Sequence, residues 1–253
     1  MITNKSNARH FLTPDWDAPP SIHAALTLRT GGVSLDCFAS LNSATHVNDN
    51  PEAVLKNRIL IKKMLNLPSE PVWLEQVHGN RIVDLDRIDF KNLSGLEIAD
   101  ASFTRQSGIV CAVLTADCLP LAFCSYDGQK IAAVHAGWKG LLTGIITHTV
   151  AALETKDLCV WLAPAIGAEK FEVGDEVRTL FINKHPKFAA AFRPHTPQKW
   201  LADIYQLARI ELNGLGITQI YGGEFCTVSD PERFYSYRRD NSTGRMVTLL
   251  WKD

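Results

Sequence analysis

The stretch GIVCAVLTADCLPLAFCSYDGQKIAAVH, residues 108–135, decides the fold. It holds three short apolar runs, Gly108–Leu114, Pro120–Cys124 and Lys130–His135, each with the length of a buried strand. A helix is expected next, over residues 140–153. Because neighbouring strands occur as often as strands that alternate with helices, the pattern favours an α+β fold with mixed β-sheets flanked by helices over a doubly wound parallel fold.

The rest of the chain carries the signals of a single domain. No long linker, low-complexity tract or internal repeat divides residues 1–253, and we expect residues 1–20 to form a peripheral N-terminal segment. Asn50 and Pro51 are typical of a helix start, and an apolar stripe follows at Ala53, Leu55, Ile59, Leu60 and Met64. Further strands are expected at 21–30, 72–77, 81–85, 158–162, 219–221 and 246–251, and further helices at 174–183 and 201–213.

Composition and charge argue against several classes of function. Of 253 residues, 46% are hydrophobic and 21% are charged, and the net charge of −1 gives no global field that would attract nucleic acid or an anionic membrane. The N-terminus lacks the apolar core of a secretory signal, and no run approaches the ~18 apolar residues of a membrane span. We therefore expect a cytoplasmic protein with reduced cysteines and no nucleic-acid or membrane partner.

Reactive side chains interrupt the apolar runs where strands end. They are His78 in Glu-Gln-Val-His, Cys118 in Thr-Ala-Asp-Cys, and His135 in His-Ala-Gly-Trp-Lys-Gly. Two imidazoles and one thiolate suit zinc, whose catalytic sites use three protein ligands and leave a fourth position for water or substrate. The spacings of 40 and 17 residues match no known zinc module. Two structural histidines and a core cysteine are therefore an open alternative.

The same residues permit a second chemistry without a metal. Cys118 would be the nucleophile and His135 its base, as in cysteine hydrolases, with a carboxylate or amide orienting the imidazole. Asp117 is adjacent in sequence, but neighbours on a strand point to opposite faces. The residues alone do not decide between these two interpretations.

Many further motifs resemble those of the YfiH-type family, also called laccase-domain or polyphenol oxidase proteins. The resemblance covers roughly residues 20 to 250. Two positions depart from the family pattern: Lys139 replaces an arginine, which keeps the charge but loses a bidentate fork, and Ala163 replaces a glycine before Pro164. Besides the three segments above, the matching motifs are Thr27–Ser34, Ala39–Asn42, His46–Asp49, Asn57–Arg58, Ala99–Ala101 with Thr104, Phe171–Gly174, Cys226–Thr227, Ser236–Asp240 and Thr243–Arg245.

The resemblance implies a metal, a fold and an activity. It implies zinc bound by His78, Cys118 and His135, and an α+β fold of the CNF/YfiH-like type, shared with proposed cysteine hydrolases. The implied activity is purine nucleoside phosphorylase action on adenosine, inosine and methylthioadenosine, with adenosine deaminase action alongside it. The alternatives within the family are an amidase that edits peptidoglycan precursors and, from an older label, a laccase.

The laccase label is testable on histidine content. A multicopper oxidase supplies several copper sites largely from His-x-His pairs, whereas this chain has eight histidines and no such pair. A set of several coppers is therefore not expected. Copper(II) in the single site also suits the ligands, because it outcompetes zinc at most nitrogen and sulfur sites. A copper-dependent polyphenol oxidase is thus the second alternative.

Each activity needs further side chains. Deamination needs a carboxylate that moves protons beside an activated water, and Glu75 or Glu172 could serve, although either could equally be a surface residue. Phosphorolysis needs a site for the phosphate anion, and the forked guanidinium group of arginine matches phosphate. A structural salt bridge is an equally good explanation for each arginine proposed here. The candidates for binding phosphate are Arg29, Lys139, Arg238 and Arg239, with Asn42 for a ribose hydroxyl and Trp138, Tyr235 and Tyr237 for stacking on the purine. The sequence does not predict an oligomeric state.

Overall fold

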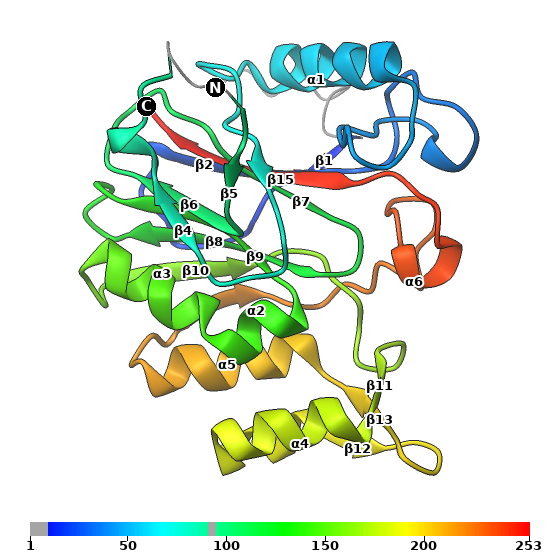
Figure 1. The fold of residues 1–253 in the computed structure, drawn as a ribbon. Coiled ribbons are helices and arrows are strands. Elements are labelled where there is room, and N and C mark those ends of the chain that lie inside the picture. The colour runs from blue at the N-terminus through cyan, green and yellow to red at the C-terminus, as the bar shows by residue number, and fades with distance from the viewer. Residues whose placement is uncertain (1–9, 91–94) are drawn as a thin grey trace.

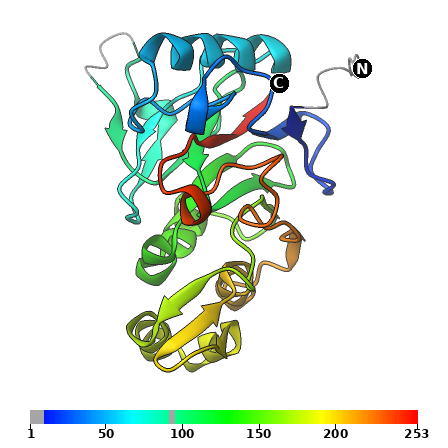
Figure 2. The same ribbon diagram turned by 90° about the vertical axis from the view of Figure 1, so that its right-hand side faces the viewer.

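Two β-sheets packed face to face form the centre of the molecule, and helices cover their outer faces (Figures 1 and 2). The structure is a computed structural model that describes residues 10–90 and 95–253. The layers run from α1 (Pro51–Leu65) through a four-stranded and a six-stranded sheet to α3 (Ile145–Leu153) and α5 (Ile204–Gly214). Three buried clusters fill the spaces between these four layers.

The four-stranded sheet is antiparallel and joins the two ends of the chain. Its order is β1 (Phe11–Leu12), β2 (Ile22–Thr27), β15 (Met246–Lys252) and β7 (Cys111–Thr115). The C-terminal strand therefore lies between an early and a central strand, and this placement brings residues just before β15 close to those that follow β7.

The six-stranded sheet is mixed. Antiparallel pairs form its centre, and one parallel pair lies at each edge, β10 with β14 and β4 with β6. Its order is β14 (Gln219–Gly222), β10 (Leu158–Leu162), β8 (Leu119–Ser125), β9 (Ile131–Ala136), β6 (Ala101–Thr104) and β4 (Ile82–Asp84). The three central apolar runs are confirmed as β7, β8 and β9, and the prediction of mixed sheets is confirmed with them.

Smaller elements complete the fold beside the main layers. A parallel pair of short strands and a three-stranded sheet complete the fold, and the three-stranded sheet lies beside α4 at the bottom of Figure 1. These strands are β3 (Leu74–Glu75) with β5 (Glu97–Ile98), and β11 (Glu172–Gly174), β13 (Lys199–Ala202) and β12 (Phe192–Pro194). The remaining helices are α2 (Trp138–Thr143), α4 (Asp175–Lys184) and α6 (Tyr237–Asp240), with 3₁₀ turns at Asp36–Phe38, Leu85–Arg87 and Pro186–Ala191.

The helices differ from the predicted ones at two breaks. The helix expected over 140–153 is two helices, α2 and α3, because Gly144 between them has a φ of +90° that a continuous helix does not allow. The helix expected from residue 201 begins at Ile204, where the Asp203 side chain accepts the amide N–H of Gln206 as an N-cap. Residues 199–202 form β13 instead.

The start of α1 is confirmed, but the predicted apolar stripe is wrong at Leu55 and Ile59, while Met64 packs against the core as expected. The Asn50 side chain accepts two N–H groups of the first turn. Leu55 and Ile59 are 61% and 58% exposed, whereas the helix buries Val54, Asn57 and Ile61. The reason is the Asn57 amide, which donates hydrogen bonds to the loop at 34–42. A buried polar anchor, rather than apolar content alone, therefore sets the rotation of the helix.

The N-terminal residues expected to be peripheral are only partly described. Residues 1–9 lie outside the described part of the chain, while β1 extends one edge of the four-stranded sheet and Phe11 is buried against it. Within the described residues, no helix is both long enough and apolar enough to span a bilayer.

Candidate metal centre

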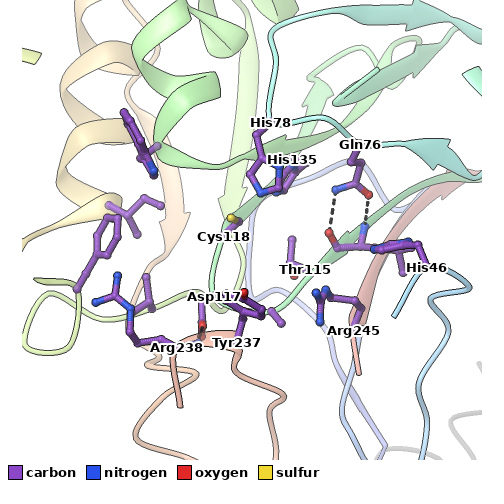
Figure 3. A pocket seen from close by; sticks show the side chains of 16 residues that line it. His46, Gln76, His78, Thr115, Asp117, Cys118, His135, Tyr237, Arg238 and Arg245 are labelled. Carbon is purple, nitrogen blue, oxygen red and sulfur yellow. Dashed lines mark hydrogen bonds between the residues drawn. The ribbon is translucent and has the colours of Figure 1, made fainter. Parts of the chain in front are cut away.

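His78, Cys118 and His135 meet at one point of the structure. One ligand atom from each, imidazole nitrogen or thiol sulfur, lies within 4.8 Å of the other two. The two imidazole rings are 4.7 Å apart between centroids and nearly perpendicular, at 82°. Figure 3 shows the three side chains converging. Two nitrogens and one sulfur at this spacing form a ligand set that zinc accepts with small side-chain rotations.

Strand pairing explains how distant residues meet. β8 and β9 are antiparallel neighbours with Pro120 opposite His135, so Cys118 at the start of β8 lies near the end of β9. His78 precedes β4, which belongs to the same sheet through β6. Its φ of +60° turns the chain sharply between β3 and β4, a conformation that histidine adopts more readily than most residues.

Asp100, in the turn before β6, organises two of the three ligands. Its carboxylate accepts the Nδ1–H of His135 at 2.7 Å, which leaves Nε2 of that ring for a metal. The same carboxylate accepts the backbone N–H groups of Val77, His78 and Gly79 at 3.2, 2.9 and 2.7 Å. One fully buried carboxylate thus fixes the ring of His135 and the backbone of His78.

The other side of the His78 segment is fixed by Gln76. Its side-chain amide donates to the carbonyl of Leu114 at 2.8 Å and accepts the N–H of Leu114 at 2.7 Å, as the dashed lines in Figure 3 show. Gln76 therefore ties the segment before His78 to the end of β7, while Asp100 ties the segment from Val77 to Gly79.

Gly137 leaves the space that a metal centre needs. A Cβ atom at this position would lie 3.1 Å from Cδ2 of His78 and 3.2 Å from Sγ of Cys118. It would also lie 3.7 Å from Nε2 of His135. All three ligands thus approach the backbone of Gly137 so closely that a side chain there would crowd them. The convergence of the ligands and the chemistry of their donors fit a bound metal ion.

The electrostatics favour a thiolate at Cys118. Burial alone would raise the pKa of this thiol, but the charge and hydrogen bonding of His135 and His78 outweigh burial and lower it to about 6. For His135, burial would lower the pKa, but Cys118 and Asp100 raise it to about 9. Burial opposes ionisation of Asp100 too, yet its hydrogen bonds to His135, Gly79 and Val77 hold its pKa below the usual value. A thiolate is the form in which cysteine binds metal.

The three ligands open into a cavity of about 520 Å³ with two unlike walls. Its size is in the range of small-molecule sites. One wall, on the helical side, is apolar and consists of Trp138, Ile166, Phe171 and Ile204. The other wall is mainly polar and consists of His46, Gln76, Leu114, Thr115 and Arg245. Ala116, Asp117, Tyr237 and Arg238 complete the lining (Figure 3).

Asp117 holds the rim of this cavity. Its carboxylate accepts hydrogen bonds from the hydroxyls of Thr227 and Ser236, at 2.6 and 3.0 Å, and from the N–H of Arg238 at 2.6 Å. These donors all belong to the segment that leads into α6. Cys118 and Asp117 thus serve different parts of the site.

The two glutamates predicted as proton carriers do not line the cavity. Glu75 is exposed on β3, and its neighbour Gln76 faces the cavity instead. Glu172 on β11 is 42% exposed at its side chain and lies 3.5 Å from His195. Phe171, next to it, is the lining residue. The alternation of side chains along a strand accounts for both shifts by one residue.

Of the four predicted anion-binding residues, only Arg238 lines the cavity. Arg29 and Arg239 lie elsewhere because backbone carbonyls occupy their guanidinium groups: Arg29 donates to Ala39 and Pro231, and Arg239 to Thr227, Val228 and Phe234. Lys139 is exposed, with Nζ 5.7 Å from the Trp138 ring.

Among the other predicted substrate contacts, Trp138 and Tyr237 line the cavity, whereas Tyr235 is fully buried beneath it. The predicted ribose contact, Asn42, is also fully buried. Its amide donates to Ala44 and Asp49 and accepts the N–H of Arg245, so it has no exposed atom for a ligand. Asn42 therefore holds Arg245 in place rather than contacting substrate.

Sequence reasoning missed His46, Thr115 and Arg245 as cavity residues. Each belongs to a segment whose pattern stood out, His46–Asp49, Thr115–Cys118 and Thr243–Arg245. The available signal was that each of the three is a polar residue within a motif. Nothing in the sequence indicates that position 46 lies near position 245.

The grouping of possible metal-binding side chains indicates how many metal ions the described residues can hold. In the described part of the chain, His78, Cys118 and His135 are the one group of three or more histidine, cysteine or acidic residues that could hold a metal ion. The chain thus offers a single metal centre there, and the ligands for a three-copper cluster are not assembled among these residues.

The sequence matches known proteins over nearly its full length. Residues 23–253 match the family described as "Multi-copper polyphenol oxidoreductase laccase". A curated purine nucleoside phosphorylase of Pseudomonas aeruginosa is 47% identical over 244 residues, and purine nucleoside phosphorylase YfiH of Escherichia coli is 46% identical over 243. Each comparison covers 95% of this chain and 98% of the relative.

Solved structures also resemble this chain over nearly its full length. The crystal structure of a Neisseria meningitidis protein superposes with a TM-score of 0.91 at 43% identity, covering 96% of this chain and 99% of that one. YlmD from Geobacillus stearothermophilus gives 0.90 at 31% identity, covering 97% of both chains. The chain therefore belongs to the laccase-type polyphenol oxidoreductase family that includes YfiH.

Proposed function

We propose that this chain is a zinc-dependent purine nucleoside phosphorylase that acts on adenosine, inosine and methylthioadenosine in the cytoplasm. The observation that carries the proposal is the cavity, which joins a three-ligand centre to one apolar wall and one mainly polar wall that carries Arg245. A flat purine and a phosphate dianion together need such a pair of walls. Relatives named purine nucleoside phosphorylase, 43–47% identical over nearly the whole chain, support the same activity.

The residues of the chain divide the work of binding. Trp138 and Phe171 offer aromatic surface for a purine ring. Arg245, on the polar wall, offers a guanidinium group for an anion. Asp100 keeps His135 in the tautomer whose Nε2 faces the centre. Zinc held by His78, Cys118 and His135 would supply a Lewis acid at the open end of this ligand set.

The reaction balances without any further reagent. A phosphate oxygen forms a bond to C1′ of the nucleoside, and the bond from C1′ to the purine nitrogen breaks. The electron pair of that bond stays on the purine, which takes the proton of the attacking hydrogen phosphate. The products are a sugar 1-phosphate and the free base.

Deamination has weaker support than phosphorolysis. Zinc deaminases use a carboxylate beside the activated water. Asp117 is the one carboxylate among the residues that line the cavity, and three hydrogen-bond donors already occupy its oxygens. A copper-dependent oxidase has support only in the ligand types, which copper(II) also accepts.

A cysteine-type hydrolase, such as an amidase, is the second candidate because of one observation. Cys118, His135 and Asp100 form a series of nucleophile, base and orienting carboxylate, with the thiol pKa lowered to about 6. The arrangement that sequence reasoning sought with Asp117 is thus provided by Asp100. Such a hydrolase would work without metal and without phosphate.

A single assay separates these activities. Adenosine, inosine and methylthioadenosine are incubated with the zinc-loaded protein with and without phosphate, and bases are separated from nucleosides by chromatography. The proposal predicts free base only when phosphate is present. Base release that is equal with and without phosphate, or no release from any of the three, would contradict it. Conversion of adenosine to inosine would reveal the deaminase.

A further inference from the structure

Burial lowers the pKa of the Arg245 guanidinium and outweighs Cys118 and Asp117, which act on its charge only from a distance. Arg245 follows the turn at Thr243 and Gly244, whose carbonyls accept its Nη1 at 2.8 and 3.0 Å. Among the described residues, no carboxylate forms an ion pair with it, although its side chain is half-buried and lines the cavity. A partly buried charge ordinarily has a counter-charge, so this one calls for an anion from outside.

The guanidinium is held rigidly before any ligand arrives. Besides the two carbonyls, the backbone N–H of Arg245 donates to the buried Asn42 side chain at 3.0 Å. The ring of Tyr237 lies 5.9 Å from its central carbon. Because both hydrogen bonds that its side chain donates within the described residues use Nη1, Nε and Nη2 are the atoms left to face a ligand. A fixed fork of this kind suits an oxyanion.

The polar wall offers an imidazole and a hydroxyl beside Arg245. His46 lines the same wall, and burial together with the charges of Arg245 and Arg58 lowers the pKa of its imidazole. Arg58 itself lies 3.8 Å above the ring of Trp73. Thr115 adds a buried hydroxyl that has no hydrogen-bond partner in the structure. The one carboxylate of the cavity lining, Asp117, is occupied by the rim.

Arg238 is a poorer anion site than Arg245. Figure 3 shows the two arginines on opposite sides of Tyr237, with Arg245 on the side of His46 and Thr115. Arg238 is exposed, and its Nη1 donates to the carbonyl of Glu172 across the ring of Phe171. It thus belongs to the apolar wall, where a base would lie.

We infer that Arg245, His46 and Thr115 form a binding site for a tetrahedral oxyanion on the polar wall of the cavity. The role of this site in binding inorganic phosphate as a co-substrate rests on the proposed phosphorylase function. The shared chemistry, a phosphate dianion, could come from free phosphate or from the phosphate group of a nucleotide. With the anion at Arg245 and the base at the apolar wall, the sugar spans the space beside the metal ligands.

The test measures anion binding apart from turnover. Phosphate, sulfate and adenosine monophosphate are titrated into the zinc-loaded protein by calorimetry, for the wild type, Arg245→Gln, Arg245→Lys and Arg238→Gln. Losing a charge-assisted hydrogen bond weakens binding by about 10- to 100-fold, which we expect of Arg245→Gln, with an intermediate loss for Arg245→Lys. Arg238→Gln removes the same charge at the other side of Tyr237 and should weaken phosphate by less than about 3-fold. Zinc content verifies that each variant is folded.

The outcomes separate the site from the activity. Arg245-dependent phosphate or sulfate binding without phosphorolysis supports the oxyanion site and contradicts the phosphorylase. Binding of adenosine monophosphate alone supports the site and identifies a nucleotide as its source. Phosphorolysis whose phosphate KM is the same in wild type, Arg245→Gln and Arg245→Lys would overturn the inference. Equal weakening by Arg245→Gln and Arg238→Gln would also overturn it, because only the general positive charge would then matter.

Discussion

Asp100 and Asp117 are two buried aspartates near the ligands, and their carboxylates hold different groups. Asp100 accepts hydrogen bonds from the His135 ring and from the backbone of Val77, His78 and Gly79. Asp117 accepts hydrogen bonds from the segment that leads to Tyr237 and Arg238. Asp100 accepts four hydrogen bonds and Asp117 accepts three, so each carboxylate holds other groups of the site in place.

The difference teaches how the site is divided. Asp100 supports the metal ligands, whereas Asp117, adjacent to the ligand Cys118, supports the rim that faces the substrate. Sequence proximity to a ligand therefore says little about which carboxylate serves the metal. The two aspartates can be separated experimentally because metal affinity and substrate affinity are different measurements.

The largest effect is expected from Asp100→Asn. Loss of a carboxylate that orients a ligating histidine weakens metal affinity by about 10- to 100-fold. Zinc affinity is measured by competition with a chromophoric chelator, and the band pattern of the cobalt-substituted protein reports ligand geometry. Asp117→Asn is the matched control and should keep wild-type zinc affinity. If both variants bind zinc like the wild type, the division between the two aspartates is wrong.

Asp117→Asn should instead affect the rim. Hydrogen bonds to a charged group contribute about 1.5–3 kcal/mol each, and an amide oxygen retains part of them, so we expect a loss of about 1–3 kcal/mol in the free energy of unfolding. The nucleoside KM should rise because Tyr237 and Arg238 lose their anchor. Chemical denaturation and steady-state kinetics check both expectations, and unchanged values for both would remove the anchoring role.

Gly137→Ala tests the space that faces the ligands. The new Cβ would press on His78 and Cys118 at 3.1 and 3.2 Å. Ligands moved by a few tenths of an ångström should lower zinc affinity by about tenfold, since supporting changes around a metal site have effects of that order. Gly214→Ala, where an added Cβ meets nothing within 4 Å, is the control. Equal zinc affinities in the two variants would contradict a metal at this point.

The smallest effect concerns the thiol of the metal-free protein. With the pKa of Cys118 lowered to about 6, iodoacetamide should label it half-maximally near pH 6, and the rate should fall as pH drops through that value because the thiolate is protonated. Peptide mass spectrometry separates Cys118 from the exposed Cys37. Asp100→Asn should move the midpoint upward, because His135 then stabilises the thiolate less. A midpoint at the usual thiol pKa in the wild type would contradict the stabilisation of the Cys118 thiolate by His135.

The central strands and the three candidate residues His78, Cys118 and His135 could be identified from local signals, but only the family resemblance favoured a metal over a cysteine nucleophile. A cysteine or histidine that ends an apolar run stands out without knowledge of the fold. The polar wall could not be predicted in this way. His46 and Arg245 are 199 positions apart, and they come together because β15 pairs with β2 and the N–H of Arg245 donates to Asn42 in the loop that precedes His46. The prediction for Glu75 and Glu172 missed the cavity by one position, since each is the sequence neighbour of a lining residue.

The role of Asp100 also depends on non-local pairing. Its motif, Ala99–Ala101, was visible in the sequence, but its partners come from a loop 21–23 residues earlier and a strand 35 residues later. The face of α1 was misjudged because apolar content suggested Leu55 and Ile59, whereas the buried Asn57 determines the rotation. Sequence patterns thus identify the chemistry, and long-range pairing determines which polar residues support it.

The central claim is one metal per chain, held by His78, Cys118 and His135 and needed for turnover. The most direct measurement is zinc content by mass spectrometry beside phosphate-dependent base release, for the wild type and the alanine variants of the three ligands. We predict one zinc per wild-type chain, and loss of both zinc and activity in each variant. Full turnover by a metal-free Cys118→Ser protein would contradict the account.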